Sequence, residues 1–274
     1  MKAQAAEELK AIMEEQADLS EQEPIYGYGH NGTMIPLSGG YSPVTLGENQ
    51  VFDWSDCGWD GSGSSGIVCC EWDAEASFKR LDVQTNIAGF GSAWATGKVG
   101  KYFSVIGPPG ESQMANIRIT GHYDGEMYSL SPLGVGISDV EIELVILNVM
   151  SGGKEKGEIL RETCPVILGC GSHIADFNVV EDVLLMAGVD YCAYLRCRCD
   201  SVVVDGKANS DFHNPDSYDY VDYDYIAIEF GYEPPTVGID IIGTIDKEKV
   251  IRAYYYRHFS ILRGILPRYF RWMW

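Results

Sequence analysis

The sequence predicts a mainly β protein: an antiparallel β-sandwich of immunoglobulin-like or jelly-roll type, with a short N-terminal helix and a C-terminal extension. Apolar and polar residues alternate in many short segments between about residues 78 and 232, which is typical of half-buried strands. No long helical repeat separates these segments. The composition agrees, since 31 Gly and 17 Tyr against only 20 Lys plus Arg suit strands and turns.

The longest alternation runs through VDYCAYLRCRCD, where Tyr191, Leu195 and Cys197 share one face and Arg196 and Arg198 take the other. Further strands are predicted around 81–87, 99–106, 117–123, 140–146 and 224–230. The segment at 140–146 becomes apolar on both faces near its end, which indicates a central strand. About seven short strands joined by turns is the pattern of a sandwich.

One short segment, LMAGVDY at residues 185–191, has Leu185, Gly188 and Tyr191 at fixed spacing. It resembles the tyrosine corner of immunoglobulin-like and fibronectin-like sandwiches. The resemblance implies that the hydroxyl of Tyr191, at the start of a strand, returns to the backbone upstream. It covers about a dozen residues and implies architecture without function.

Four segments follow from the composition. Residues 1–24 read as a helical N-terminal arm with a narrow apolar stripe among glutamates. Residues 25–77 are rich in Gly, Ser and Asp and read as a loop segment. Residues 78–232 form the predicted sandwich domain, and residues 233–274 form a basic, aromatic tail.

The formal net charge of −20 opposes binding to nucleic acid, because phosphate contacts need an excess of cations. No apolar run is long enough for a transmembrane helix. The first residues contain no apolar stretch of the secretory type. The default expectation is a location inside the cell or in a particle assembled there, and an extracellular surface if a leader precedes this sequence.

The tail inverts the charge of the body, with seven Lys or Arg against Asp246 and Glu248 in residues 246–274. Mixed with bulky aromatics, these cations suit packing on the chain's own domain, docking on an acidic partner or second copy, or attachment to a membrane surface. The predicted contact residues are Arg257, Arg263, Arg268, Arg271, Trp272 and Trp274.

Two acidic clusters are candidates for calcium, the only cofactor that the residues suggest, because hard cations take several carboxylate oxygens on adaptable loops. The cluster predicted as a metal site comprises Asp216, Asp219, Asp222 and Asp224. The other comprises Asp53, Asp56 and Asp60. Neither has the spacing of an EF-hand, and acidic loops without a bound cation are common in a chain with 40 Asp plus Glu, so they are the preferred interpretation of both clusters.

No motif names a reaction. Cys170, Ser172 and His173 are close in sequence, but catalytic partners usually come from distant segments, so a turn is the preferred interpretation. The glycine-rich stretches lack the spacing of a phosphate-binding loop. The pairing of the eight cysteines cannot be read from the sequence.

Two functions follow. The first is a non-enzymatic structural or recognition protein that assembles through its termini with copies of itself or another protein, in a surface, filament or virion. The alternative is a carbohydrate-binding or carbohydrate-active sandwich, calcium-dependent or not, suggested by Trp54, Trp59, Trp72 and Trp94 beside acidic loops. A hydrolase would further need two carboxyls about 5 to 10 Å apart in a cleft.

Overall fold

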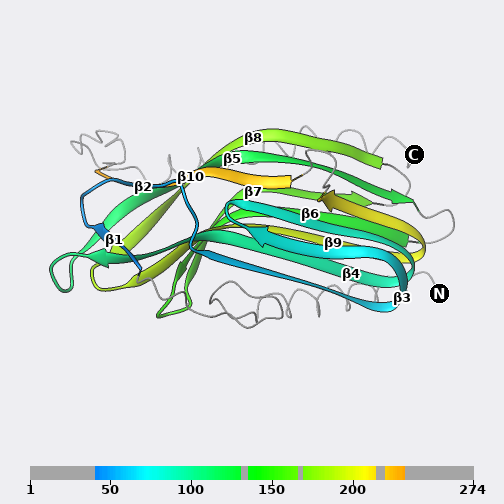
Figure 1. The fold of residues 1–274 in the computed structure, drawn as a ribbon, viewed down its shortest axis with the longest axis horizontal. Coiled ribbons are helices and arrows are strands. Elements are labelled where there is room, and N and C mark those ends of the chain that lie inside the picture. Colours follow the sequence, from blue (N-terminus) through cyan, green and yellow to red (C-terminus); the bar gives the residue numbers. More distant parts are fainter. Residues whose placement is uncertain (1–40, 131–134, 166–168, 214–219, 232–274) are drawn as a thin grey trace, which may run out of the picture. The chain divides into compact units, whose positions relative to one another are not determined.

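The computed structural model of the protein describes residues 41–130, 135–165, 169–213 and 220–231, all within the compact unit that spans Met1–Tyr232. Within these ranges the chain forms ten strands and no helix (Figure 1). The strands are β1 Ser42–Thr45, β2 Gln50–Phe52, β3 Cys57–Ser77, β4 Arg80–Ile106, β5 Ser112–Leu130, β6 Val135–Asn148, β7 Lys154–Pro165, β8 Gly169–Met186, β9 Asp190–Phe212 and β10 Tyr220–Phe230.

The strands pair antiparallel, except that β1 runs parallel to the end of β4. The predicted mainly β, antiparallel fold is therefore confirmed. The choice between an immunoglobulin-like and a jelly-roll topology stays a prediction. The expected helix in residues 1–24 and the tail 233–274 lie outside the described residues.

The strands form two layers that are continuous with each other. One layer has the order β3-β4-β9-β6-β7, and the other consists of β8, β5, β10 and β2. They join where Glu126–Leu130 of β5 pairs with Lys207–Asp211 of β9, and where Val221 of β10 pairs with Leu81 of β4. Figure 1 shows β8, β5 and β10 together along one side of the ribbon and β9, β4 and β3 along the other.

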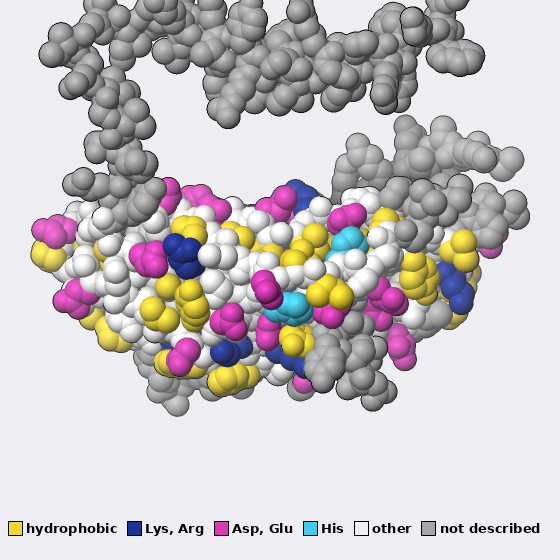
Figure 2. Space-filling view, turned by 90° about the horizontal axis from the view of Figure 1, so that it is seen from above, with side chains coloured by type: hydrophobic (Ala, Val, Ile, Leu, Met, Phe, Trp, Pro, Cys, Tyr) yellow, Lys and Arg dark blue, Asp and Glu magenta, His cyan; other side chains and the backbone are white. Residues whose placement is uncertain are grey.

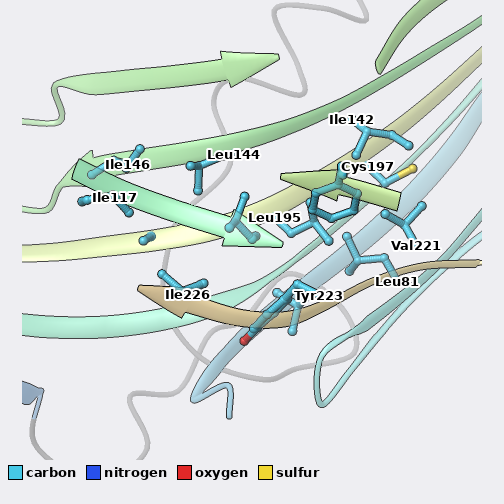
Figure 3. Close-up of a cluster of buried hydrophobic side chains, with 14 of the residues drawn as sticks. Leu81, Ile117, Ile142, Leu144, Ile146, Leu195, Cys197, Val221, Tyr223 and Ile226 are labelled. Carbon is cyan, nitrogen blue, oxygen red and sulfur yellow. The ribbon is translucent and has the colours of Figure 1, made fainter. Parts of the chain in front are cut away.

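The main hydrophobic core lies between the inner faces of these layers. Every second residue of the long strands points into it, as strand geometry requires. Between Tyr191 and Cys199, β9 contributes Tyr191, Ala193, Leu195, Cys197 and Cys199, on the single face that the alternation predicts, and Phe212 joins them from the end of the strand. Figure 3 shows side chains of β4, β5, β6, β9 and β10 meeting there, among them Leu81, Ile117, Ile142, Leu195 and Ile226.

Residues 57–77, which composition alone places in the loop segment 25–77, form the long strand β3, while β1 and β2 occupy 42–45 and 50–52. The small residues are what the pairing of β3 with β4 needs. A Cβ on Gly91 would stand 2.1 Å from the carbonyl oxygen of Ser65, and one on Gly89 would stand 2.4 Å from that of Ile67. Both glycines also have positive φ. Close backbone approach therefore explains glycine in this hairpin better than a flexible loop does.

Tyr191 begins β9 directly after the turn that follows β8. Its hydroxyl accepts a hydrogen bond from the backbone N–H of Met186 (3.1 Å) and donates one to the carbonyl of Leu184 (3.4 Å). The ring stacks on Phe103 with a centroid distance of 5.6 Å. The side chain thereby ties the end of β8 to the core through both its ring and its hydroxyl.

We expect Tyr191→Phe to lower the free energy of unfolding by about 1 kcal/mol, because the N–H of Met186 loses its acceptor while the ring stack is kept. Urea denaturation followed by fluorescence measures the change. Tyr225→Phe, on the outer face of β10, is the matched control. Equal stability of the two variants would show that the hydroxyl of Tyr191 contributes nothing.

Candidate functional site

The predicted calcium cluster is only partly within the described residues. Asp216 and Asp219 lie outside them, whereas Asp222 and Asp224 lie on β10. Asp222 faces His122 of β5 in the register, and burial raises the pKa of its carboxyl. Within the described ranges, no group of three His, Cys, Asp or Glu side chains could hold a metal ion. A calcium site that uses all four aspartates stays a prediction, as do the six tail contacts, which also lie outside.

The second acidic cluster is engaged with the protein itself. Asp56 accepts hydrogen bonds from the ammonium of Lys101 (2.5 Å) and from the backbone N–H of Tyr102 (2.8 Å). Asp60 accepts one from the N–H of Ala76 at 3.1 Å. Lys101 is fully buried, and this desolvation lowers its pKa despite the pairing with Asp56. Two of the three carboxylates are therefore already bonded within the protein, which leaves few carboxylate oxygens to coordinate a cation.

The four tryptophans differ in environment. Trp54 is 45% exposed and lies over the ammonium of Lys101. Trp72 packs against the small core cluster of Ile87, Ala93, Val203 and Ala208. Trp59 is buried and covered by the ammonium of Lys98, 4.5 Å from its ring centroid. Trp94 is half-buried. Only Trp54 is as exposed as the sequence suggests.

The segment that contains Cys170, Ser172 and His173 offers no free thiol among the described residues. Cys170 forms a disulfide with Cys164, so its thiol is consumed. Both Ser172 and His173 lie on β8, and the ring of His173 is 3.7 Å from Glu162. Burial raises the pKa of the thiols of Cys192 and Cys199. We assign no catalytic role to this segment.

Charged and aromatic residues meet instead on the outer face of the β3-β4-β9-β6-β7 layer, which we term the polar face. Its residues alternate with those that enter the core, and the strand register aligns them in three rows across five strands. The rows are Trp59, Lys98, Arg196, Glu143 and Glu158; Gly61, Thr96, Arg198, Glu141 and Arg161; and Gly63, Trp94, Asp200, Asp139 and Thr163.

Ion pairs link these rows. Arg196 bonds to Glu141 and lies 3.0 Å from Glu143, and Arg161 contacts Glu141 at 2.9 Å. Arg198 donates hydrogen bonds to both carboxylate oxygens of Asp200, from Nε at 2.5 Å and from Nη2 at 2.9 Å. The side chains of Arg196 and Glu143 are each only 7% exposed. Such a network fixes the directions of its members, because a displaced charge here would lose its partner in a poorly solvated place.

Glycines on β3 let the indoles lean across the polar face. A Cβ on Gly63 would stand 2.9 Å from Nε1 of Trp94 and 3.2 Å from its Cε2. A Cβ on Gly61 would stand 2.6 Å from Cη2 of Trp59 and 3.5 Å from that of Trp94. The ring of Trp94 therefore rests on bare backbone of the neighbouring strand β3, and that of Trp59 rests on its own strand. The same residues that suggest a loop by composition form the bed of an aromatic surface.

A pocket of about 270 Å³ opens on the polar face between β6, β7 and β9. Its polar lining includes Asp139, Glu141, Arg161, Thr163, Arg198 and Asp200. Burial, and secondarily the charge of Asp200, raise the pKa of Asp139, while a hydrogen bond from Thr163 opposes the shift. Oδ1 of Asp139 is buried without a hydrogen-bond partner among the described residues. Trp94 is directly opposite Asp200 in the register, so an aromatic surface adjoins this pocket.

Sequence reasoning singled out Trp94 and placed Arg196 and Arg198 on one face, but it gave neither Asp139 nor Glu141 a role in a site and predicted no pocket. The missing information is the register, which brings residues more than fifty positions apart into one row. The available signal was the alternation of acids in 139–143 facing the alternation of cations in 196–198. Charge complementarity between two predicted strands could have paired them.

No family model and no curated protein sequence matches the chain. Among solved structures, the chain has a low similarity to the three that follow. The structure of a carbohydrate-binding module from the β-sandwich superfamily, described as promiscuous in specificity, aligns with a TM-score of 0.21 at 10% identity, over 66% of this chain and 57% of that one. The module TmCBM61 with β-1,4-galactotriose gives 0.20 at 8%, over 62% and 88%. The enzymatically active domain of bacteriophage CBA120 tailspike protein 4 gives 0.22 at 9%, over 61% and 19%.

This chain thus spans little more than half of the first module and about a fifth of the tailspike chain. Scores of this size establish no common fold, so function must be argued from the polar face itself. No helix among the described residues is long and apolar enough to cross a membrane.

The raised pKa of Asp139 predicts a pH-dependent cost to stability. The folded state keeps this proton to a higher pH than the unfolded state, so it binds more protons between the two pKa values, and stability falls as pH rises through that interval. Asp139→Asn cannot ionise. We therefore expect the free energy of unfolding of this variant to increase relative to that of the wild type as pH rises from about 3 towards neutrality.

Urea denaturation at a series of pH values checks this expectation. Asp182→Asn, an exposed aspartate on β8, is the control. Parallel pH curves for the wild type and Asp139→Asn would contradict a raised pKa at Asp139.

Proposed function

We propose that the chain is a glycan-binding protein whose binding surface is the polar face, with Trp94 and the adjoining pocket at its centre. The observation that carries this proposal is the third row of the register, where Trp94, Asp200 and Asp139 follow one another across β4, β9 and β6. An indole offers a flat apolar surface to the C–H face of a sugar ring. Carboxylates and guanidiniums beside it offer directed hydrogen bonds to hydroxyls.

The rigidity of the polar face supports recognition. The side chains lie on long paired strands, and their directions are fixed by ion pairs such as that of Arg198 with Asp200. Side chains on paired strands lose little conformational freedom when a ligand binds, so less of the interaction energy is offset by conformational entropy. The pocket also adjoins the aromatic surface, because Asp200 of its lining is directly opposite Trp94 in the register.

Binding fits this geometry better than hydrolysis does. Asp139 and Asp200 are directly opposite on neighbouring strands, and hydrolysis of a glycosidic bond needs two carboxyls that flank the ligand. Asp200, however, is held by Arg198 through two hydrogen bonds. Its oxygens are already engaged, so it is not free to act as the second carboxyl that hydrolysis needs. We therefore propose a non-enzymatic role.

A glycan array, followed by isothermal titration calorimetry on the hits, tests the proposal. We expect Trp94→Ala to weaken binding at least about tenfold, because a central aromatic contact contributes about 1.4 kcal/mol or more. Gly63→Val should act similarly without removing the ring, since its side chain would displace the indole of Trp94 from β3.

Tyr225→Ala, on the outer face of β10, is the matched control and should bind as the wild type does. The proposal fails if the array shows no binding, or if Trp94→Ala and the control bind equally well.

A second candidate is self-assembly, the first of the functions suggested by the sequence. The termini invoked there lie outside the described residues, but β8 and β5 carry their own apolar patch. Met114 and Leu184 are directly opposite in the register and are 49% and 51% exposed, with Met186 beside them. Figure 2 shows the side of the molecule on which β8 and β5 lie, where apolar groups are interspersed with acidic ones. Exposed apolar groups on neighbouring strands favour contact with another protein surface.

If this patch mediates self-association, light scattering should show an oligomer whose mass falls at lower protein concentration. We expect Leu184→Asp to give a monomer, because it places a charge in the apolar contact. Ile67→Asp, at an exposed position on β3, should leave the mass unchanged. A wild-type monomer at every concentration would reject assembly through this patch.

A further inference from the structure

The balance of charge in the pocket bears on which glycans the polar face could take. Three carboxyls of the polar face line the pocket, those of Asp139, Glu141 and Asp200, against the two guanidiniums of Arg161 and Arg198. Carboxylates thus outnumber cations at the place where a sugar beside Trp94 would direct its polar groups. A negative site of this kind repels an anionic ligand.

Both guanidiniums are already matched to carboxylates of the pocket. Arg161 lies 2.9 Å from Glu141, and Arg198 is bound to Asp200 through two nitrogens. A uronate or sulfate group would have to replace one of these carboxylates and leave it without its cation. Displacing a charge from a partly buried pair is costly, since the remaining charge loses its compensation.

Asp139 has the opposite property, because it has spare capacity to accept hydrogen bonds. No ion pair joins it to a cation among the described residues, and its Oδ1 lacks a hydrogen-bond partner there. A buried acceptor without a partner is uncommon in folded proteins and is satisfied by water or a ligand. The group that would satisfy it is a donor, such as a sugar hydroxyl.

We propose that the polar face selects uncharged glycans and rejects anionic ones, and that Asp139 is the residue that determines this preference. This inference rests on the proposed glycan-binding function. Asp139 accepts a hydrogen bond from a ligand hydroxyl while the ring of that sugar, or of the next, lies on Trp94. The paired arginines orient the carboxylates rather than bind the ligand's charge.

The test uses the full chain and matched pairs of probes: oligomers of glucose, galactose and mannose, and the uronate oligomers of equal length. We expect the best neutral oligomer to bind the wild type at least about tenfold more tightly than its uronate counterpart. Asp139→Asn should weaken the neutral ligand about tenfold, because a charged acceptor is lost. It should also narrow the ratio between the neutral and the anionic ligand.

Asp182→Asn is the control for the loss of a negative charge far from the pocket, and it should leave both affinities unchanged. Urea denaturation of each variant confirms that it is folded. Binding of uronates as tight as that of neutral oligomers overturns the selectivity while leaving glycan binding intact. So does an unchanged ratio in Asp139→Asn. Absence of binding to every probe overturns the glycan-binding function and the selectivity together.

Discussion

The pairing of β4 with β9 is the interaction on which the rest of the structure depends. It extends from Val83 opposite Phe212 to Ser104 opposite Asp190. Each of these strands also reaches the second layer, β4 through its start at β10 and β9 through its end at β5. Because side chains alternate along a strand, this single register decides at once which residues fill the core and which stand on the polar face.

The consequence for the polar face is an uncommon concentration of charge with low exposure. Arg196 and Glu143 are nearly buried although they belong to an outer face. Arg196 forms ion pairs with both Glu141 and Glu143. Charges in such places cost desolvation, and ion pairs recover part of that cost without exceeding what apolar side chains would give. A sheet built only for stability would have no need of them. Their presence beside a half-buried indole is what makes this face a candidate for recognition.

Glycine has a double role in the same layer. The hairpin of β3 and β4 brings the two backbones so close that Gly89 and Gly91 leave no room for a side chain. Farther along β3, Gly61 and Gly63 leave space that the indoles of Trp59 and Trp94 occupy. One compositional feature thus serves both backbone packing and the shape of the surface. The proposed functions of the two layers also differ, with recognition on the polar face and protein contact on β8 and β5.

Strand positions and their inward and outward faces could be predicted from the sequence over most of 78–232, because alternation is a local property of each strand. The two faces of β9 are the clearest instance. The strand β3 was missed because its composition resembles a loop, and its extended form depends on β4. Likewise, no sequence pattern pointed to a pocket at Asp139, since its neighbours Asp200 and Thr163 come from other strands. The sequence by itself determined an acidic, antiparallel β protein and the faces of its strands. Only the tertiary structure decided which faces meet, because register depends on contacts between distant segments rather than on the order of residues within one.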